Sequence, residues 1–266
     1  MTKIGVIGCA GRMGRMLVHE VQSTPGAELS GGTERKGSEM VGRDLGELLG
    51  VRLGLAIGDD ARALFDGADA VIDFSTPSAT VQHARMAAET GKVCVIGTTG
   101  LPPEDEAVLK DAARSAPLVW SANMSVGVNL LLALVEKLAA TLDPTTFDIE
   151  VLEMHHRHKV DAPSGTALAL GKAAAAGRGQ TLDQAWRKAR DGHTGARPPG
   201  EIGFATLRGG DVVGDHTVIF AADGERIEIA HKASSRQIFA RGAVRAALWA
   251  HGRPPGLYSM KDVLGL

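Results

Sequence analysis

The sequence is poor in the residues that would mark several protein classes. It has only two cysteines, Cys9 and Cys94, and neither has a second thiol at metal-ligand spacing, so neither a disulfide framework nor a zinc site is expected. Aromatic residues make up 4% of the chain, too few for the stacking platforms that bind single-stranded nucleic acid. With 29 basic against 31 acidic residues, the chain has no general attraction to nucleic acid or to anionic membranes.

Long hydrophobic runs are absent too. No stretch reaches the roughly 18 apolar residues of a transmembrane helix, and the first residues lack the length and cleavage pattern of a signal peptide. A length of 266 residues with 44% hydrophobic residues suits one large or two modest globular domains. We therefore expect a cytoplasmic protein whose partner is a small molecule, with neither a nucleic acid nor a membrane as ligand.

The first half of the chain alternates short apolar runs with helical patterns. Apolar runs typical of buried strands are followed by segments with apolar residues at helical spacing, such as Met13, Leu17 and Val21. The predicted strands cover residues 4–7, 27–35, 70–74, 93–96 and 118–120. This alternation predicts an α/β fold with a Rossmann-like, parallel, doubly wound sheet, whose ligand lies at the carboxyl ends of the strands.

The pattern changes after Asn129. A helix is expected over residues 130–140 and a strand over 147–153, while residues 177–200, rich in glycine, arginine and proline, are expected to form a surface excursion. Further strands are expected at 202–208, 212–221 and 226–230. The turns between them, at residues 209–211 and 223–224, favour hairpins, so a mixed α+β domain with a largely antiparallel sheet is predicted.

These patterns divide the chain. We expect a dinucleotide-binding domain at residues 1–128 and a substrate-binding and oligomerisation domain at 129–236. A C-terminal helical segment, 237–266, is expected to pack back on the first domain.

Three glycines follow the first predicted strand. Gly8, Gly11 and Gly14 lie where a strand becomes a helix, and glycines there allow backbone amides to approach a pyrophosphate at the helix N-terminus. The spacing differs from the commoner G-x-G-x-x-G, so tight packing alone is the alternative. Glu34, at the end of the next strand, is placed to bind a ribose hydroxyl. Arg35 suits the 2′-phosphate of NADP, so NADH and NADPH both remain open.

The most informative stretch is the basic loop, residues 155–159, which reads His-His-Arg-His-Lys. So many potential cations repel one another unless an anion is present. A metal site is one alternative, but Arg157 and Lys159 would oppose a dication, and no metal is expected. A solvated surface loop is the other alternative. The functional interpretation is a site that binds a carboxylated substrate and supplies protons to it.

Two neighbouring segments fit the same interpretation. Ser164, Gly165 and Thr166 open a helix, and the free amides of a helix N-terminus favour a carboxylate. Lys232 and Arg236 form a cation pair that could complete the site. Ordinary surface charge is the alternative for this pair.

In these motifs the chain resembles the dihydrodipicolinate reductase family, also called 4-hydroxy-tetrahydrodipicolinate reductases. The resemblance covers essentially the whole chain and is most specific over residues 153–166, with further motifs at 8–14, 73–75, 95–100, 122–129, 202–205 and 231–236. It implies the two-domain fold above and a homotetramer built through the C-terminal sheets. It also implies reduction of 4-hydroxy-tetrahydrodipicolinate by NADH or NADPH, with loss of water, in lysine and diaminopimelate biosynthesis.

The resemblance also implies roles for single residues. His155 takes the position of the catalytic acid/base and Lys159 that of the proton donor, while His156, Gly165 and Thr166 bind substrate. Arg236, from the cation pair above, is also expected to bind substrate. The implied cofactor contacts lie in the glycine loop and at three strand ends: Gly8, Cys9, Ala10, Gly11, Arg12, Met13, Glu34, Arg35, Gly97, Thr98, Thr99, Ser121, Ala122, Asn123 and Met124. Cys9 and Met124 stand where a small residue and an aromatic one are often found, which bears on cofactor preference.

Three other functions fit the sequence less well. A semialdehyde dehydrogenase that forms a thioester needs a cysteine near the nicotinamide, and neither Cys9 in the glycine loop nor Cys94 in mid-strand suits that role. A sugar dehydrogenase has no need for so many cations in one loop. A regulator that binds NAD(H) without turnover should carry a DNA-binding element or a basic face, and the sequence has neither.

Overall fold

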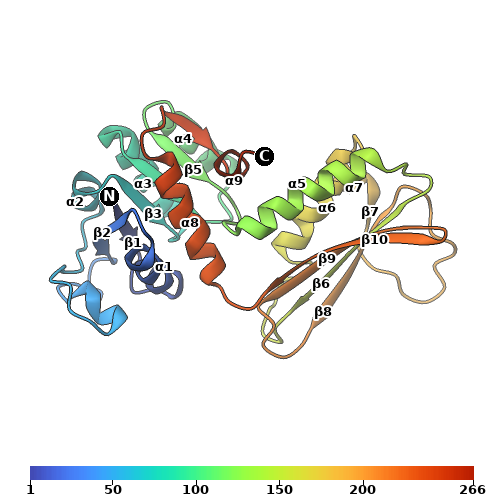
Figure 1. Ribbon diagram of the computed structural model, residues 1–266, viewed down its shortest axis with the longest axis horizontal. Helices are drawn as coiled ribbons and strands as arrows, with labels where there is room; N and C mark the ends of the chain where they lie inside the picture. Colours follow the sequence, from blue (N-terminus) through green and yellow to red (C-terminus); the bar gives the residue numbers. More distant parts are fainter. The chain divides into compact units, whose positions relative to one another are not determined.

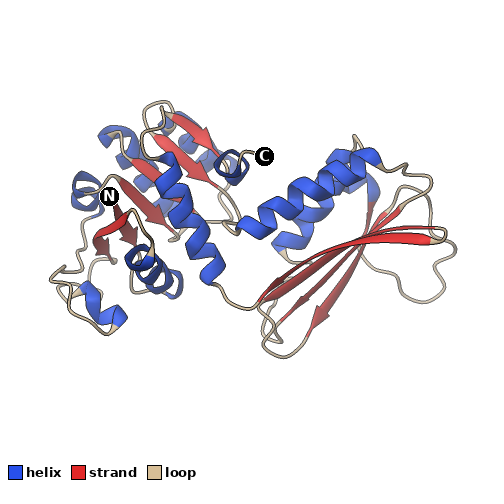
Figure 2. Ribbon diagram, in the orientation of Figure 1, coloured by secondary structure: helices blue, strands red, loops and turns tan.

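The computed structural model describes residues 1–266. They form two compact units: Met1–Val126 together with Arg236–Gly265, here the first unit, and Gly127–Ser235, here the second unit. Figure 1 follows the chain through both of them, and Figure 2 shows that each unit combines one sheet with helices. No helix combines the length and the apolar character needed to cross a membrane.

The first unit contains a six-stranded sheet in which every neighbouring pair is parallel. This confirms the predicted Rossmann-like sheet. The strands lie in the order β11 (Gly256–Tyr258), β5 (Pro117–Trp120), β4 (Val93–Ile96), β3 (Ala70–Asp73), β1 (Thr2–Ile7) and β2 (Ala27–Thr33). The helices of this unit are α1 (Arg12–Ser23), the 3-10 helix Leu45–Leu49, α2 (Ala61–Gly67), α3 (Pro77–Thr90), α4 (Pro103–Ala112), α8 (Gln237–Ala250) and α9 (Met260–Leu264).

Both faces of the central strands of this sheet are buried, which explains why β4 is apolar at every position and β3 is apolar up to Asp73. Ile72 on β3 packs into a core shared with α1 and α8, whereas its neighbour Val71 packs into a second core shared with α2, α3 and α4. Successive residues of a strand point to opposite faces. A strand between two helical layers therefore has no polar face.

The helix α8 completes the first unit although it follows the second unit in sequence. It is rich in small residues, and six of its alanine and valine side chains belong to the same core as β1 and α1. Gly242 lies so close to the chain before α5 that an added Cβ would be 1.7 Å from the Met124 carbonyl oxygen. Small side chains let this helix lie directly on the sheet and on α1.

The second unit is built on a five-stranded mixed sheet covered on one face by helices. The strands lie in the order β10 (Glu225–Ala233), β9 (Gly214–Ala222), β6 (Asp148–His155), β8 (Ile202–Arg208) and β7 (Trp186–Arg187). The helices are α5 (Val126–Thr141), α6 (Gly165–Gly177) and α7 (Leu182–Ala185). β6 alternates intermediate and buried residues along its whole length, as a strand with one covered face should.

One expected hairpin is wrong. β9 and β10 form the antiparallel hairpin predicted at residues 223–224, but β8 and β9 do not pair across residues 209–211. β6 lies between them and pairs in parallel with β8 and antiparallel with β9. The chain does turn at Gly210 and Asp211. However, the Gly209 amide donates to the His155 carbonyl at the end of β6 and not to β9. The sheet is therefore mixed.

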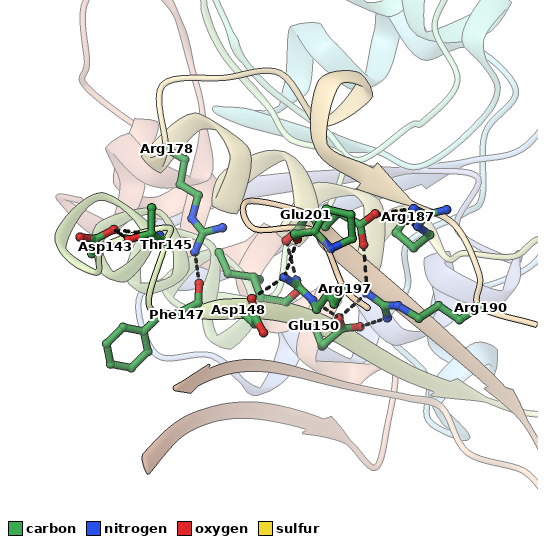
Figure 3. A network of polar contacts seen from close by, with 12 residues as sticks. Asp143, Thr145, Phe147, Asp148, Glu150, Arg178, Arg187, Arg190, Arg197 and Glu201 are labelled. Carbon is green, nitrogen blue, oxygen red and sulfur yellow. Dashed lines mark hydrogen bonds and ion pairs between the residues drawn. The ribbon is translucent and has the colours of Figure 1, made fainter. Parts of the chain in front are cut away.

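The arginine-rich segment between α7 and β8 is fastened to β6. Figure 3 shows Arg187, Arg190 and Arg197 gathered around the carboxylates of Glu150 and Glu201. Arg190 and Arg197 lie 2.9 and 3.1 Å from the Glu150 carboxylate, and Arg187 lies 2.5 Å from that of Glu201. Charge pairing therefore holds an excursion that has little regular structure of its own.

Candidate active site

The glycine loop, residues 8–14, turns the chain from β1 into α1 with little room to spare. Gly8 has a φ of +65°, in the left-handed region that favours glycine. An added Cβ on Gly14 would lie 2.0 Å from the Gly8 carbonyl oxygen and 2.7 Å from the Cα of Cys9. Only glycine lets α1 begin this close to β1, which is the helix–strand packing that dinucleotide-binding loops require.

Most amides of this loop bond within the protein. The Gly8 and Cys9 amides donate to the Thr33 carbonyl at 2.8 and 3.1 Å, and the Gly11 amide donates to the Gly8 carbonyl at 3.0 Å. No side chain caps the start of α1, and the amides of a first helical turn have no acceptor within the helix. An anion at this loop would therefore meet the helix start at Arg12 rather than the glycines themselves.

Glu34 and Arg35 lie beside this helix start. The Ala10 amide donates to Glu34 Oε1 at 2.8 Å, so the carboxylate expected at the ribose also holds the loop. Both residues line a cavity of about 800 Å³ together with Gly8 and Lys36. The cavity lies at the carboxyl ends of β1, β2 and β3, where a doubly wound sheet binds its ligand.

A buried polar network supports the loop after β4. Asp73, at the end of β3, is fully buried and accepts hydrogen bonds from Thr80 at 2.9 Å and from the His83 ring at 2.8 Å. Thr80 also bonds the Thr98 hydroxyl at 2.8 Å. Burial alone would raise the pKa of Asp73, but the hydrogen bonds from His83, Ser75 and Thr80 hold it below its usual range. A buried carboxylate thus fixes Thr98, while the neighbouring Thr99 is exposed.

The segment after β5 is held in the same way. The Ser121 amide donates to the Ile96 carbonyl at 3.2 Å, and its hydroxyl donates to the Asn123 carbonyl at 2.8 Å. Ala122 is exposed. Met124 is 1% exposed and its side chain lies in the hydrophobic core, so only its backbone can meet a ligand. A sequence pattern does not tell whether a predicted ligand contact is made by an exposed residue or by the backbone of a buried one.

Neither thiol can act as a nucleophile. Both cysteines are fully buried. Burial, with the charge of Glu34, raises the pKa of Cys9 to about 12, and burial raises that of Cys94 well above its ordinary value. Because the thiolate is the reactive form, thioester chemistry has no candidate residue here.

In the second unit, the basic loop begins where β6 ends, and Glu153 lies beneath it. Glu153 is 1% exposed, and each of its carboxylate oxygens accepts two hydrogen bonds. Oε2 accepts from His155 Nδ1 at 2.5 Å and from Arg208 at 2.9 Å. Oε1 accepts from the Ser164 amide and from Arg208, both at 3.0 Å. Burial alone would raise the pKa of Glu153, but these bonds hold it below its usual range.

His155 therefore has one nitrogen committed and one available. His155 is 8% exposed, its Nδ1 donates to Glu153, and its Nε2 makes no hydrogen bond within the protein. An added Cβ on Gly214 would lie 2.9 Å from that Nε2. Glycine at this position of β9 leaves the space that the ring occupies.

His216 packs edge-on against His155, with ring centroids 5.1 Å apart. Its Nε2 lies 3.1 Å from the Ser164 hydroxyl, which in turn accepts the Ala167 amide and caps α6. Burial, with the charge of His155, lowers the pKa of His216 to about 4. His216 is therefore a neutral imidazole that helps to fix the start of α6.

The other candidate residues of the second unit lie around this cluster. Lys159 Nζ donates to Asp161 at 2.8 Å, and Arg208 donates to the Asp161 carbonyl at 2.7 Å. Gly165 and Thr166 are the first two residues of α6. His156 lines an open cavity of about 730 Å³ with Arg157, His158, Gly210 and Asp211. Arg236, the fourth predicted substrate ligand, belongs to the first unit.

Glu153, His155 and His216 present ligand atoms within 4.8 Å of one another, as a metal site would. The sequence did not reveal this cluster, because His216 lies far along the chain. Arg208 bonds both oxygens of the carboxylate, and a guanidinium in that position opposes a dication. The arrangement is that of a hydrogen-bonded ion pair.

Comparison with protein families agrees with this geometry. Residues 2–124 match the family model described as dihydrodipicolinate reductase, N-terminus, and residues 127–264 match the one described as dihydrodipicolinate reductase, C-terminus. The chain belongs to the dihydrodipicolinate reductase family. The two matches meet at the boundary between the structural units.

Other members of the dihydrodipicolinate reductase family are similar over nearly their whole length. A 4-hydroxy-tetrahydrodipicolinate reductase of Mesorhizobium japonicum is 58% identical over 98% of this chain and 96% of its own. One of Brucella abortus is 57% identical over 98% of both chains. A dipicolinate-bound dihydrodipicolinate reductase from Paenisporosarcina has the same fold, with a TM-score of 0.79 over 98% of this chain and 99% of its own at 22% identity.

Proposed function

We propose that this chain reduces 4-hydroxy-tetrahydrodipicolinate to tetrahydrodipicolinate, with loss of water, by means of NADH or NADPH. This is a step of lysine and diaminopimelate biosynthesis. Family membership and the relatives at 57 and 58% identity support it. The observation in the structure that carries the proposal is the basic loop around His155 and Lys159, beside the capped start of α6.

The glycine loop and its surroundings suit a dinucleotide. The start of α1 takes the pyrophosphate, Glu34 the ribose and Arg35 the 2′-phosphate of NADPH. Thr99 and Ala122, exposed at the ends of neighbouring strands, extend the site toward the nicotinamide. When bound, the nicotinamide supplies the hydride. The cavity at the carboxyl ends of β1, β2 and β3, and the packing that excludes any side chain on Gly14, support this placement.

The basic loop suits a ring with two carboxylates. His156 and the first amides of α6, at Gly165 and Thr166, bind a carboxylate through charge and hydrogen bonds. Reduction adds a hydride to an electron-poor carbon conjugated to an imine, so negative charge develops toward the ring nitrogen and the adjacent carbon. A proton supplied there lowers the barrier. Lys159 donates that proton, and His155 exchanges one through Nε2.

The proposal is tested with a coupled assay. Aspartate semialdehyde, pyruvate and the synthase that condenses them supply the substrate, and loss of NADH or NADPH absorbance reports turnover. We expect oxidation that depends on all three additions. Tight NADH binding without oxidation of either cofactor would instead favour a regulator that only senses NAD(H), and would overturn the proposal.

We further propose a cytoplasmic homotetramer assembled through the second units. The helices α5 and α6 cover one face of the mixed sheet (Figure 2). Leu152 and Met154 point to the other face by strand alternation, and Leu207, which lies beside Met154, is 48% exposed. An exposed apolar face of this kind is stabilised when a second copy of the chain covers it. Sedimentation velocity should give a tetramer that Leu207→Glu dissociates, whereas a monomeric parent protein would refute the assembly.

A further inference from the structure

The basic loop starts and ends on one buried carboxylate. His155, the last residue of β6, donates through Nδ1 to Glu153 Oε2, and the Ser164 amide, the cap of α6, donates to Glu153 Oε1. The eight residues between them contain Lys159 and the rest of the basic loop. A single side chain therefore fixes both ends of the segment that carries the proposed proton donors.

Arg208 extends this connection to the middle of the loop. Its guanidinium bonds both oxygens of Glu153 and also donates to the Asp161 carbonyl at 2.7 Å. The Asp161 carboxylate accepts from Lys159 Nζ at 2.8 Å. Hydrogen bonds from Glu153 on β6 and Arg208 on β8 thus reach both His155 and, through Asp161, Lys159. Burial makes the central ion pair sensitive to the loss of either partner.

We propose that Glu153 and Arg208 are a positioning pair for the reaction: they hold the His155 ring with Nε2 toward the substrate and Lys159 at its donating position. This inference rests on the proposed function, because it assigns how the same site is held. Neither residue touches the substrate. Glu153 fixes which nitrogen of His155 carries the committed proton, as the partner of a histidine does in other acid–base sites.

The direction of each contact makes the assignment specific. A carboxylate with four donors accepts at every position, so it holds His155 Nδ1 as a donor and leaves Nε2 to exchange protons. In Glu153→Gln the amide nitrogen replaces one acceptor with a donor, which faces either Arg208 or His155. The ring of His155 then loses its fixed orientation while the apolar core beneath it is unchanged.

The test uses the full-length protein and two kinds of readout. We expect Glu153→Gln to lower kcat about 100-fold or more, with the NADH dissociation constant unchanged and the alkaline limb of the kcat profile moved to lower pH. ¹⁵N spectra of the imidazoles should show His155 changing its tautomer or protonation. Glu150→Gln is the matched control, because Glu150 lies on the opposite face of β6 and pairs with Arg190 and Arg197.

Arg208→Lys is the second variant, should Glu153→Gln fail to fold. It keeps the charge but loses the bidentate contact, and we expect a smaller fall in kcat with the same change in the His155 spectrum. The positioning role is overturned if His155 keeps its tautomer in either variant, or if kcat falls with no change in the pH profile. The spectra do not depend on turnover. An inactive parent protein would therefore refute the proposed reaction, while the effect of each variant on the His155 tautomer could still be measured.

Discussion

The pKa of His216 makes a quantitative prediction about stability. The folded protein holds this ring neutral down to about pH 4, whereas an unfolded chain protonates it near pH 6.5. Below pH 6.5 the unfolded state binds a proton on this ring that the folded state does not bind, so the free energy of unfolding falls as the pH falls. The contribution of the neutral ring to stability is fully present only above pH 6.5. At about 1.4 kcal/mol per pKa unit, this amounts to roughly 3 kcal/mol in total, of which about 2 kcal/mol is lost between about pH 7 and pH 4.5.

The perturbation that isolates this contribution is His216→Gln, which keeps a polar partner for Ser164 and removes the titration. Urea unfolding is measured at a series of pH values and fixed protein concentration, with hydrogen exchange of the β6 and β9 amides identifying the transition of the second unit. We expect the parent protein to lose about 2 kcal/mol more than the variant over this range. His193→Gln, at an exposed position of the same unit, is the control. Equal slopes for parent and His216→Gln would refute the reasoning.

Three further predictions concern the ligand sites. Lys159→Ala should lower turnover about 100-fold and leave NADH affinity unchanged in a fluorescence titration; loss of NADH binding with normal turnover would contradict its role. Gly14→Ala should cost about 1–3 kcal/mol of stability through overpacking and abolish NADH binding, as thermal unfolding and the same titration would show. Arg35→Ala should weaken NADPH binding about tenfold but not NADH binding; equal losses for both cofactors would place Arg35 away from the 2′-phosphate.

The sequence pattern was sufficient for β3, β4 and β5 because each of these strands is short, largely apolar and buried on both faces. Ile72 and Val71 show the reason: alternate residues meet different cores, so the whole run must be apolar. β11 was missed, since Gly256–Tyr258 has only three residues at the sheet edge. No periodic pattern can be recognised over that length.

The mixed sheet was harder to predict because its pairing is not local. Turn residues after β8 predicted a hairpin, but β6 lies between β8 and β9. The last residue of β6 is 47 positions before the first residue of β8 in the sequence. The same distance hid most of the supporting residues of the site. Glu153 could have been found, since it lies two residues before His155 and strand alternation places both on one face. Arg208 and His216 join that face only through strand register.

The first unit is interrupted by the second, and this affects how the chain folds during synthesis. The core of the first unit includes Ala240, Ala243 and Val244 of α8, which leave the ribosome after every residue of the second unit. The mixed sheet can be complete while the parallel sheet still exposes the apolar surface that α8 will cover. A chain truncated before residue 236 would thus carry a complete second unit and an aggregation-prone first unit.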